Sequence, residues 1–142
     1  MSEQNFKNHT RIVVGFHVVT FFAILALLIG SIVNLIHSEK ENLYSASLIC
    51  LIAVILGLFF VFVRTFPLKA QDRAIRAEEN LRHFVITGKP LSSKLTIPQI
   101  VALRFASDEE FVDLAAKAVQ ENLSNKQIKQ AIKNWRADYY RA

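Results

Sequence analysis

Two long apolar segments dominate the first half of the chain. Residues 12–36 hold 19 apolar residues among 25, residues 45–63 hold 16 among 19, and neither segment contains a charged residue. As α-helices they would be about 37 Å and about 28 Å long, close to the thickness of about 30 Å of a bilayer core. A chain this short cannot cover two helices that are apolar on every side. The pattern therefore predicts a transmembrane hairpin with a short loop at residues 37–44.

The basic residues near the two segments predict their orientation. Lys7 and Arg11 precede the first segment, and Lys40 is the one basic residue of the loop. Four more follow the second segment: Arg64, Lys69, Arg73 and Arg76. Because Lys and Arg are enriched in cytoplasmic flanks, we expect residues 1–11 and 64–142 in the cytoplasm, with only the loop outside.

Small and weakly polar residues share one side of each predicted span. Small side chains let helices approach closely in lipid, which favours a tight hairpin. These residues are His17, Thr20, Gly30, Ser31 and Asn34 on the first span, and Ala46, Cys50, Ala53 and Gly57 on the second. An ion or substrate path along His17 and Asn34 is the alternative, although the spans contain no carboxylate as a relay partner.

The remaining residues, 64–142, follow the pattern of short amphipathic helices. Phe66-Pro67 predicts a break or kink after the second span and a new helix that ends near Gly88. One face of that helix is apolar: Ala70, Ala74, Ala77, Leu81, Phe84 and Val85. Capping boxes predict three more helix starts, at Thr96–Gln99, Ser107–Glu110 and Ser124–Gln127. The predicted fold class is all-α, a two-helix hairpin followed by a cytoplasmic bundle of about four helices.

The last predicted helix, residues 125–140, combines an apolar face with a basic ridge. Its apolar face is Ile128, Ala131, Ile132, Trp135 and Tyr139, and its ridge is Lys126, Lys129, Lys133 and Arg136, with Tyr140 beside them. Such a ridge is a candidate surface for anionic lipid, for a protein or for nucleic-acid phosphate. The simplest interpretation is a solvated helix face.

Composition and motifs offer little chemistry. The net charge is +5, hydrophobic residues make up 52%, and a single cysteine excludes a disulfide framework. Phosphate-binding loops, dinucleotide-binding glycines, zinc-protease and serine-hydrolase motifs are absent. The four histidines do not share metal-ligand spacing. We therefore expect no enzyme, no catalytic residue, no cofactor and no metal.

Three stretches of the cytoplasmic part carry a resemblance. QDRAIRAEENLRHFVITGKPL, LTIPQIVALRFASDEEF and AIKNWRADYYRA resemble a family of small, uncharacterised bacterial inner-membrane proteins with a two-span hairpin and a helical tail. The resemblance implies this architecture and supplies no activity. It also suggests a structural ion-pair network of Arg73, Arg76, Glu79, Arg82, Arg104, Asp108 and Glu110.

These observations favour a scaffold, accessory or regulatory subunit of an inner-membrane complex. The expected partners are membrane lipids and either a membrane protein complex or further copies of the chain. A membrane-tethered nucleic-acid or ribosome binder is the first alternative. A channel or transporter subunit is the second, although two spans lack the internal repeats of secondary transporters.

Overall fold

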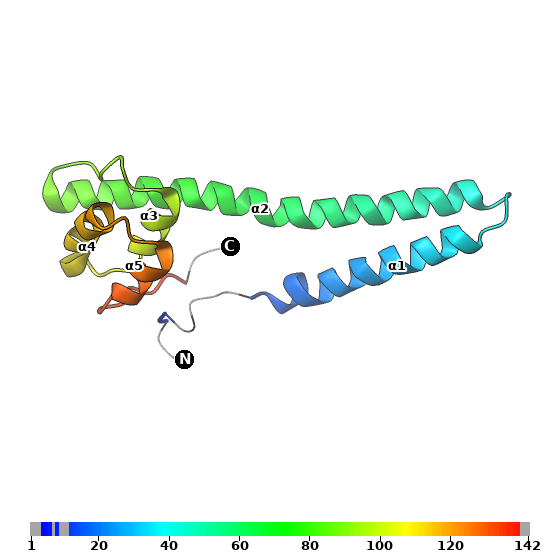
Figure 1. Cartoon of the computed structure of the whole chain (residues 1–142), viewed down its shortest axis with the longest axis horizontal. Helices are drawn as coiled ribbons and strands as arrows, with labels where there is room; N and C mark the ends of the chain where they lie inside the picture. The colour runs from blue at the N-terminus through cyan, green and yellow to red at the C-terminus, as the bar shows by residue number, and fades with distance from the viewer. Residues whose placement is uncertain (1–3, 7, 9–11, 140–142) are drawn as a thin grey trace. The chain divides into compact units, whose positions relative to one another are not determined.

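The computed structural model describes residues 4–6, 8 and 12–139, and within them it is helical, without strands (Figure 1). The elements are a π-helix η1 (Gly15–Thr20), α1 (Phe21–His37), α2 (Leu43–Thr87), α3 (Ile97–Leu103), α4 (Asp108–Gln120) and α5 (Asn125–Ala131). The predicted all-α fold class is confirmed. The chain divides into two compact units: the hairpin unit, Arg11–Phe66, and the bundle unit, Met1–Thr10 with Pro67–Ala142.

The hairpin unit contains η1, α1 and the first part of α2. Gly15–His37 and α2 are long and apolar enough to cross a membrane, and only 6% and 11% of their most apolar windows are buried. The core helices of a soluble protein are mostly buried, whereas the apolar windows of these two helices are mostly exposed. The π-helix at the start is accompanied by a side-chain bond, because the Thr20 hydroxyl donates to the Gly15 carbonyl at 2.9 Å.

α2 runs through Pro67, so no new helix begins there and, of the predicted break or kink after Phe66, the break is wrong. A proline inside a helix removes one backbone hydrogen bond and costs about 3 kcal/mol. The helix continues because strong helix formers, alanine, arginine and glutamate, follow the proline. It ends where predicted, at Gly88, which has a φ of 71° and donates its N–H to the Phe84 carbonyl at 2.8 Å. Glycine adopts this left-handed conformation without a steric penalty.

Two of the three predicted capping boxes are present, at Thr96–Gln99 and at Ser124–Gln127. The Gln99 Oε1 accepts from the backbone N–H of Thr96 at 2.8 Å, and the Gln127 Oε1 does the same for Ser124 at 2.8 Å. Gln99 is also buried, and its Nε2 donates to the Leu123 carbonyl at 2.8 Å. That bond ties the start of α3 to the turn that precedes α5.

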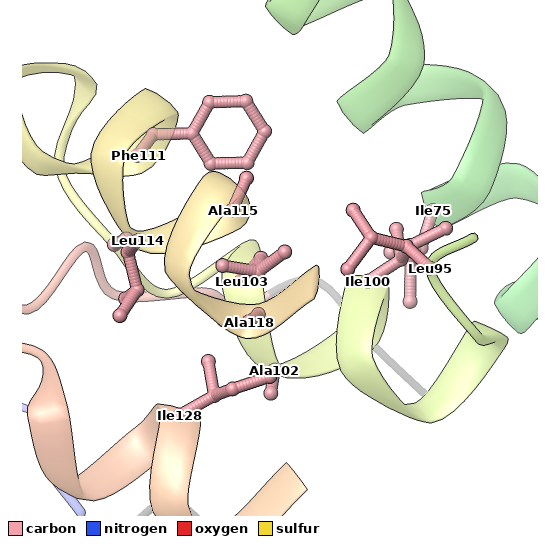
Figure 2. Close-up of a cluster of buried hydrophobic side chains, with 11 residues drawn as sticks. Ile75, Leu95, Ile100, Ala102, Leu103, Phe111, Leu114, Ala115, Ala118 and Ile128 are labelled. Atoms are coloured by element: carbon pink, nitrogen blue, oxygen red, sulfur yellow. The ribbon is translucent and has the colours of Figure 1, made fainter. Parts of the chain in front are cut away.

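The core of the bundle unit lies among α3, α4 and α5, with one face of α2 against it (Figure 2). Its largest fully buried side chains are Phe105, Phe111, Leu103 and Ile128. Smaller members fill the spaces between them: Ala102, Ala106, Ala115 and Ala118. The close fit of large and small residues is typical of a folded interior and not of a loose helical collapse.

The apolar face that the sequence gives α2 beyond the proline is not the face that packs. Leu81, Phe84 and Val85 are 62%, 53% and 74% exposed, whereas Ile75 and Glu79 are buried. The buried residues lie on the other side of the helix at 100° per residue. α2 therefore packs on the bundle through a mixed apolar and charged face and leaves its purely apolar face uncovered.

The last predicted helix is also shorter than expected. α5 ends at Ala131, and Ile132 has an extended backbone (φ −66°, ψ 124°). The chain that follows is held by backbone bonds, because the Arg136 N–H donates to the Phe105 carbonyl at 2.7 Å and the Ser107 N–H donates to the Asn134 carbonyl at 3.1 Å. Trp135 therefore does not continue a helix face but stacks on Phe105, with ring centroids 4.7 Å apart.

Candidate functional site

Arg82 joins α2 to the start of α4. Its Nη1 lies 3.0 Å from Glu79 Oε2, and its Nη2 lies 2.6 Å from Asp108 Oδ1. The same Nη2 donates to the Ala106 carbonyl at 2.8 Å, and the guanidinium lies 4.3 Å from the Phe111 ring centroid. The side chains of Arg82 and Glu79 are 10% and 7% exposed, so water screens this pair poorly. The cluster therefore connects α2 to α4 through ion pairs of one guanidinium with two carboxylates.

Glu110 has a different role from the predicted capping box. The Ser107 side chain makes no capping bond to the backbone of α4. Instead the Glu110 carboxylate accepts the backbone N–H groups of Lys133 at 3.1 Å and of Asn134 at 3.0 Å. The third predicted box is therefore wrong, because Glu110 is used to hold the segment after α5.

A further pair of contacts closes the bundle unit. The Asp138 N–H donates to Gln4 Oε1 at 2.7 Å, and Gln4 Nε2 donates to the Asp138 carbonyl at 3.1 Å. Arg104 Nη1 lies 3.3 Å from Asp138 Oδ2. No pattern near residue 4 indicates this pairing, because its two halves are 134 residues apart in the chain.

The structure divides the suggested ion-pair network. Arg82, Glu79 and Asp108 are brought together, while Arg104 pairs with Asp138 and Glu110 binds backbone. Arg73 and Arg76 form no ion pair and no hydrogen bond with any residue that the structure describes. Both are exposed and line a groove between α2 and the loop before α3.

This groove has a volume of about 590 Å³. Arg73, Arg76 and Asn80 form its wall on α2, and Ser92 and Ser93 belong to the loop opposite. The remaining lining residues are apolar: Ala77, Leu91, Ile97 and Ile100. Sequence reasoning missed the groove, and the signal available was the spacing of Arg73 and Arg76, three residues apart on one predicted helix.

The basic ridge is not one face of a helix. Lys126 and Lys129 lie on α5, whereas Lys133 and Arg136 lie beyond its end. The Lys129 Nζ lies 5.6 Å from the Phe105 ring centroid, and Arg136 lines a second hollow, next to Asp138 and Tyr139. Tyr140 lies outside the described residues. The expectation of four cations in a row along one helix is therefore wrong, because the helix ends at Ala131.

The residues of the predicted packing stripes differ in burial. Ser31, Ala46 and Ala53 are buried, and His17, Thr20, Cys50 and Gly57 are half-buried. Gly30 and Asn34 are exposed, and a Cβ added at Gly30 or Gly57 would meet no atom within 4 Å. These two glycines therefore do not permit a close approach of helices within the chain. Phe16 and Phe60 supply a contact that the stripes omit, with ring centroids 4.7 Å apart.

Glu109, in the first turn of α4, has a carboxyl group with a lowered pKa. The pKa of the exposed Glu109 carboxyl is held below its ordinary value, first by the Ser107 hydroxyl and then by the backbone amide of Glu109 itself. Carboxylates are favoured in the first turn of a helix by its dipole. Across residues 4–6, 8 and 12–139 no group of three or more His, Cys, Asp or Glu side chains is arranged to hold a metal ion.

The fold defines a class of protein: an all-helical chain with two long apolar helices followed by shorter ones that enclose a small core. A family model covers residues 1–142, and the chain belongs to this family of unknown function (DUF6526). No curated protein and no solved structure matches the chain.

Proposed function

We propose that the protein is a non-enzymatic subunit of the bacterial inner membrane that acts as a scaffold and associates with a second copy of itself. Both apolar helices would span the bilayer, and the bundle unit would lie in the cytoplasm with both termini. The observation that carries the proposal is the exposed apolar face of α2 outside the apolar span. This face belongs to the bundle unit and not to the proposed spans, so spanning a bilayer does not account for its exposure.

The pairing of Gln4 with Asp138 supports the proposed topology. The two residues flank the hairpin unit in sequence and bond to each other within the bundle unit. Chain segments that bond to each other lie on the same side of a membrane, so an even number of crossings separates them. Two spans satisfy this requirement, and the excess of basic residues in the flanks favours the cytoplasmic side.

The spacing of the exposed face favours another helix as its partner. We define the α2 seam as its residues at alternating intervals of four and three: Ala70, Ala74, Ala77, Leu81 and Phe84. All five are exposed. A repeat of this kind, with an average period of 3.5 residues, is the pattern of helices that pack side by side in a coiled coil. Small alanines let two such helices approach closely.

Charge complementarity favours a second copy in parallel orientation. Arg73 directly precedes one seam residue, and Glu78 directly follows another, five residues further on. In a parallel coiled coil these two positions of opposite helices lie next to each other, so each Arg73 would meet the partner's Glu78. Neither residue forms an ion pair with a residue in the described part of its own chain. Two copies inserted with the same topology are parallel, as this pairing requires.

Disulfide cross-linking in native membranes tests the proposal. In a Cys50→Ala background, Leu81→Cys places a thiol in the seam, and Ile86→Cys places one on the opposite side of the same helix, at a position that is 43% exposed. We expect oxidation to yield a covalent dimer for Leu81→Cys and monomer for Ile86→Cys. Equal yields from the two variants, or monomer from both, would reject the second copy as the occupant of the seam.

A further inference from the structure

We propose that the groove formed by α2 and residues 91–100 binds a phosphate ester, either the headgroup of an anionic lipid or a soluble phosphorylated compound. The groove is complete within one chain, but it shares Ala77 with the α2 seam and Arg73 with the proposed pairing to Glu78, so Arg76 is the residue that tests it separately. The inference is carried by two guanidinium groups that have no ion pair or hydrogen bond in the described part of the chain, together with the serine hydroxyl groups and apolar residues that also line the groove.

The positive charge of the groove comes from consecutive turns of α2. Arg73 and Arg76 are three residues apart, so their side chains share a side of the helix. Both line the groove, and neither forms an ion pair or a hydrogen bond with a residue that the structure describes. This differs from Arg82 on the same helix, whose guanidinium makes two ion pairs. Guanidinium groups bind phosphate oxygens with paired, charge-assisted hydrogen bonds.

The opposite wall supplies neutral polar groups. Ser92 and Ser93 are exposed and line the groove. Their loop is held in place from α2, because Asn80 Oδ1 accepts the N–H of Leu91 at 2.9 Å. That bond uses the oxygen of the Asn80 amide and leaves its NH₂ group as a donor. The donors of both walls suit a ligand that is rich in acceptor oxygens.

The volume of the groove and the sign of its charge narrow the class of ligand. The volume of about 590 Å³ exceeds what a phosphate ion fills and lies within the range of about 300–1,000 Å³ of small-molecule sites. Leu91, Ile97 and Ile100 provide apolar surface for the rest of the ligand. Among the residues that the structure describes, no carboxylate lines the groove, so its field attracts an anion and repels a cation. A phosphate monoester with an uncharged or apolar substituent meets these conditions.

Binding to the full chain in a neutral detergent tests the inference. The probe is dihexanoyl phosphatidic acid, and dihexanoyl phosphatidylcholine is the control with the same tails and no net charge. Arg76→Gln removes one guanidinium that has no ion pair or hydrogen bond to a described residue, Arg76→Lys keeps the charge without the paired geometry, and Lys117→Gln removes one exposed charge from α4. We expect about tenfold weaker binding for Arg76→Gln, an intermediate loss for Arg76→Lys and no change for Lys117→Gln.

Glycerol 3-phosphate separates the two sources of the ester. Binding of phosphatidic acid at least about tenfold tighter than of glycerol 3-phosphate assigns the groove to a lipid headgroup, whereas equal binding assigns it to a soluble ester. In both cases Arg76→Gln must weaken the interaction. Equal affinity for phosphatidic acid and phosphatidylcholine, or equal effects of Arg76→Gln and Lys117→Gln, would overturn the inference. The cross-linking of Leu81→Cys does not enter either result, so the two proposals fail separately.

Discussion

Arg82 and Asp108 connect the last turns of α2 to the first turn of α4, with Nη2 and Oδ1 2.6 Å apart. The same guanidinium neutralises Glu79, whose carboxylate is nearly removed from solvent. Asp108 also lies in the first turn of α4, where a carboxylate is stabilised by the helix dipole. One arginine thereby fixes the relation of two helices and makes the burial of an acidic side chain tolerable.

Removal of the Arg82 side chain should strongly destabilise the bundle unit. Arg82→Ala leaves Glu79 buried without its partner, which costs about 3 kcal/mol. Arg76 lies on the same helix, is exposed and forms no ion pair or hydrogen bond with a described residue, so Arg76→Ala should change the free energy of unfolding by less than about 0.5 kcal/mol. Denaturant titration followed by the fluorescence of Trp135, the single tryptophan of the chain, measures both. Similar losses in the two variants would show that the ion pair does not fasten the helices.

Glu110 should control the order of the segment that follows α5. Glu110→Ala removes the acceptor of the Lys133 and Asn134 amides, so we expect these amides to exchange hydrogen faster in the variant. The stack of Trp135 on Phe105 should loosen, with a shift of the tryptophan emission to longer wavelength. Glu109→Ala, one residue earlier and fully exposed, is the control. Unchanged exchange in Glu110→Ala would contradict the assigned role.

The two capping boxes should differ in strength. Gln99 caps α3 and also donates to the Leu123 carbonyl, whereas the exposed Gln127 caps α5 through bonds within its own box. Loss of a cap costs about 1 kcal/mol, and a buried acceptor left without its donor adds about 1–3 kcal/mol. Gln99→Ala should therefore destabilise the bundle unit more than Gln127→Ala in the same fluorescence titration. The reverse order would show that the bond to Leu123 is unimportant.

The proposed pairing of Arg73 with Glu78 of a second copy predicts a charge-reversal pattern. Arg73→Glu and Glu78→Arg each place like charges opposite each other, so each should lower the yield of the Leu81→Cys dimer. The double variant restores opposite charges and should recover the yield. High salt should weaken the difference, since exposed ion pairs are screened. Two single variants that cross-link like the parent would argue against parallel α2 helices.

Local patterns predicted what depends on near neighbours. Thr96 and Ser124 start helices because each bonds with a glutamine three residues later, and Gly88 ends α2 through its own backbone conformation. Ser107 has the same local pattern, but the backbone of Lys133 and Asn134 competes for Glu110. A bond between residues more than twenty positions apart leaves no mark in the spacing of nearby residues.

Tertiary contacts explain the other differences. The apolar period from Ile128 to Tyr139 is helical, yet the stacking of Trp135 on Phe105 and the backbone bond of Arg136 favour an extended segment. Helix propensity is a weak preference that such contacts override. The periodicity of α2 likewise identifies its apolar face, but it does not reveal that the opposite face is the one that packs on the bundle. In the bundle unit the covered face contains Glu79 and Arg82, which only their mutual neutralisation permits.

The bond between Gln4 and Asp138 has a consequence for how the chain is made. Almost the whole polypeptide separates these residues, so a nascent chain carries Gln4 long before Asp138 has been translated. The hairpin unit is synthesised entirely between them, and in the proposed topology its apolar helices meet lipid while the bundle is still open. Truncation after α5 would remove Asp138 and so leave Gln4 without this bonding partner, although α3, α4 and most of the buried core would still be present.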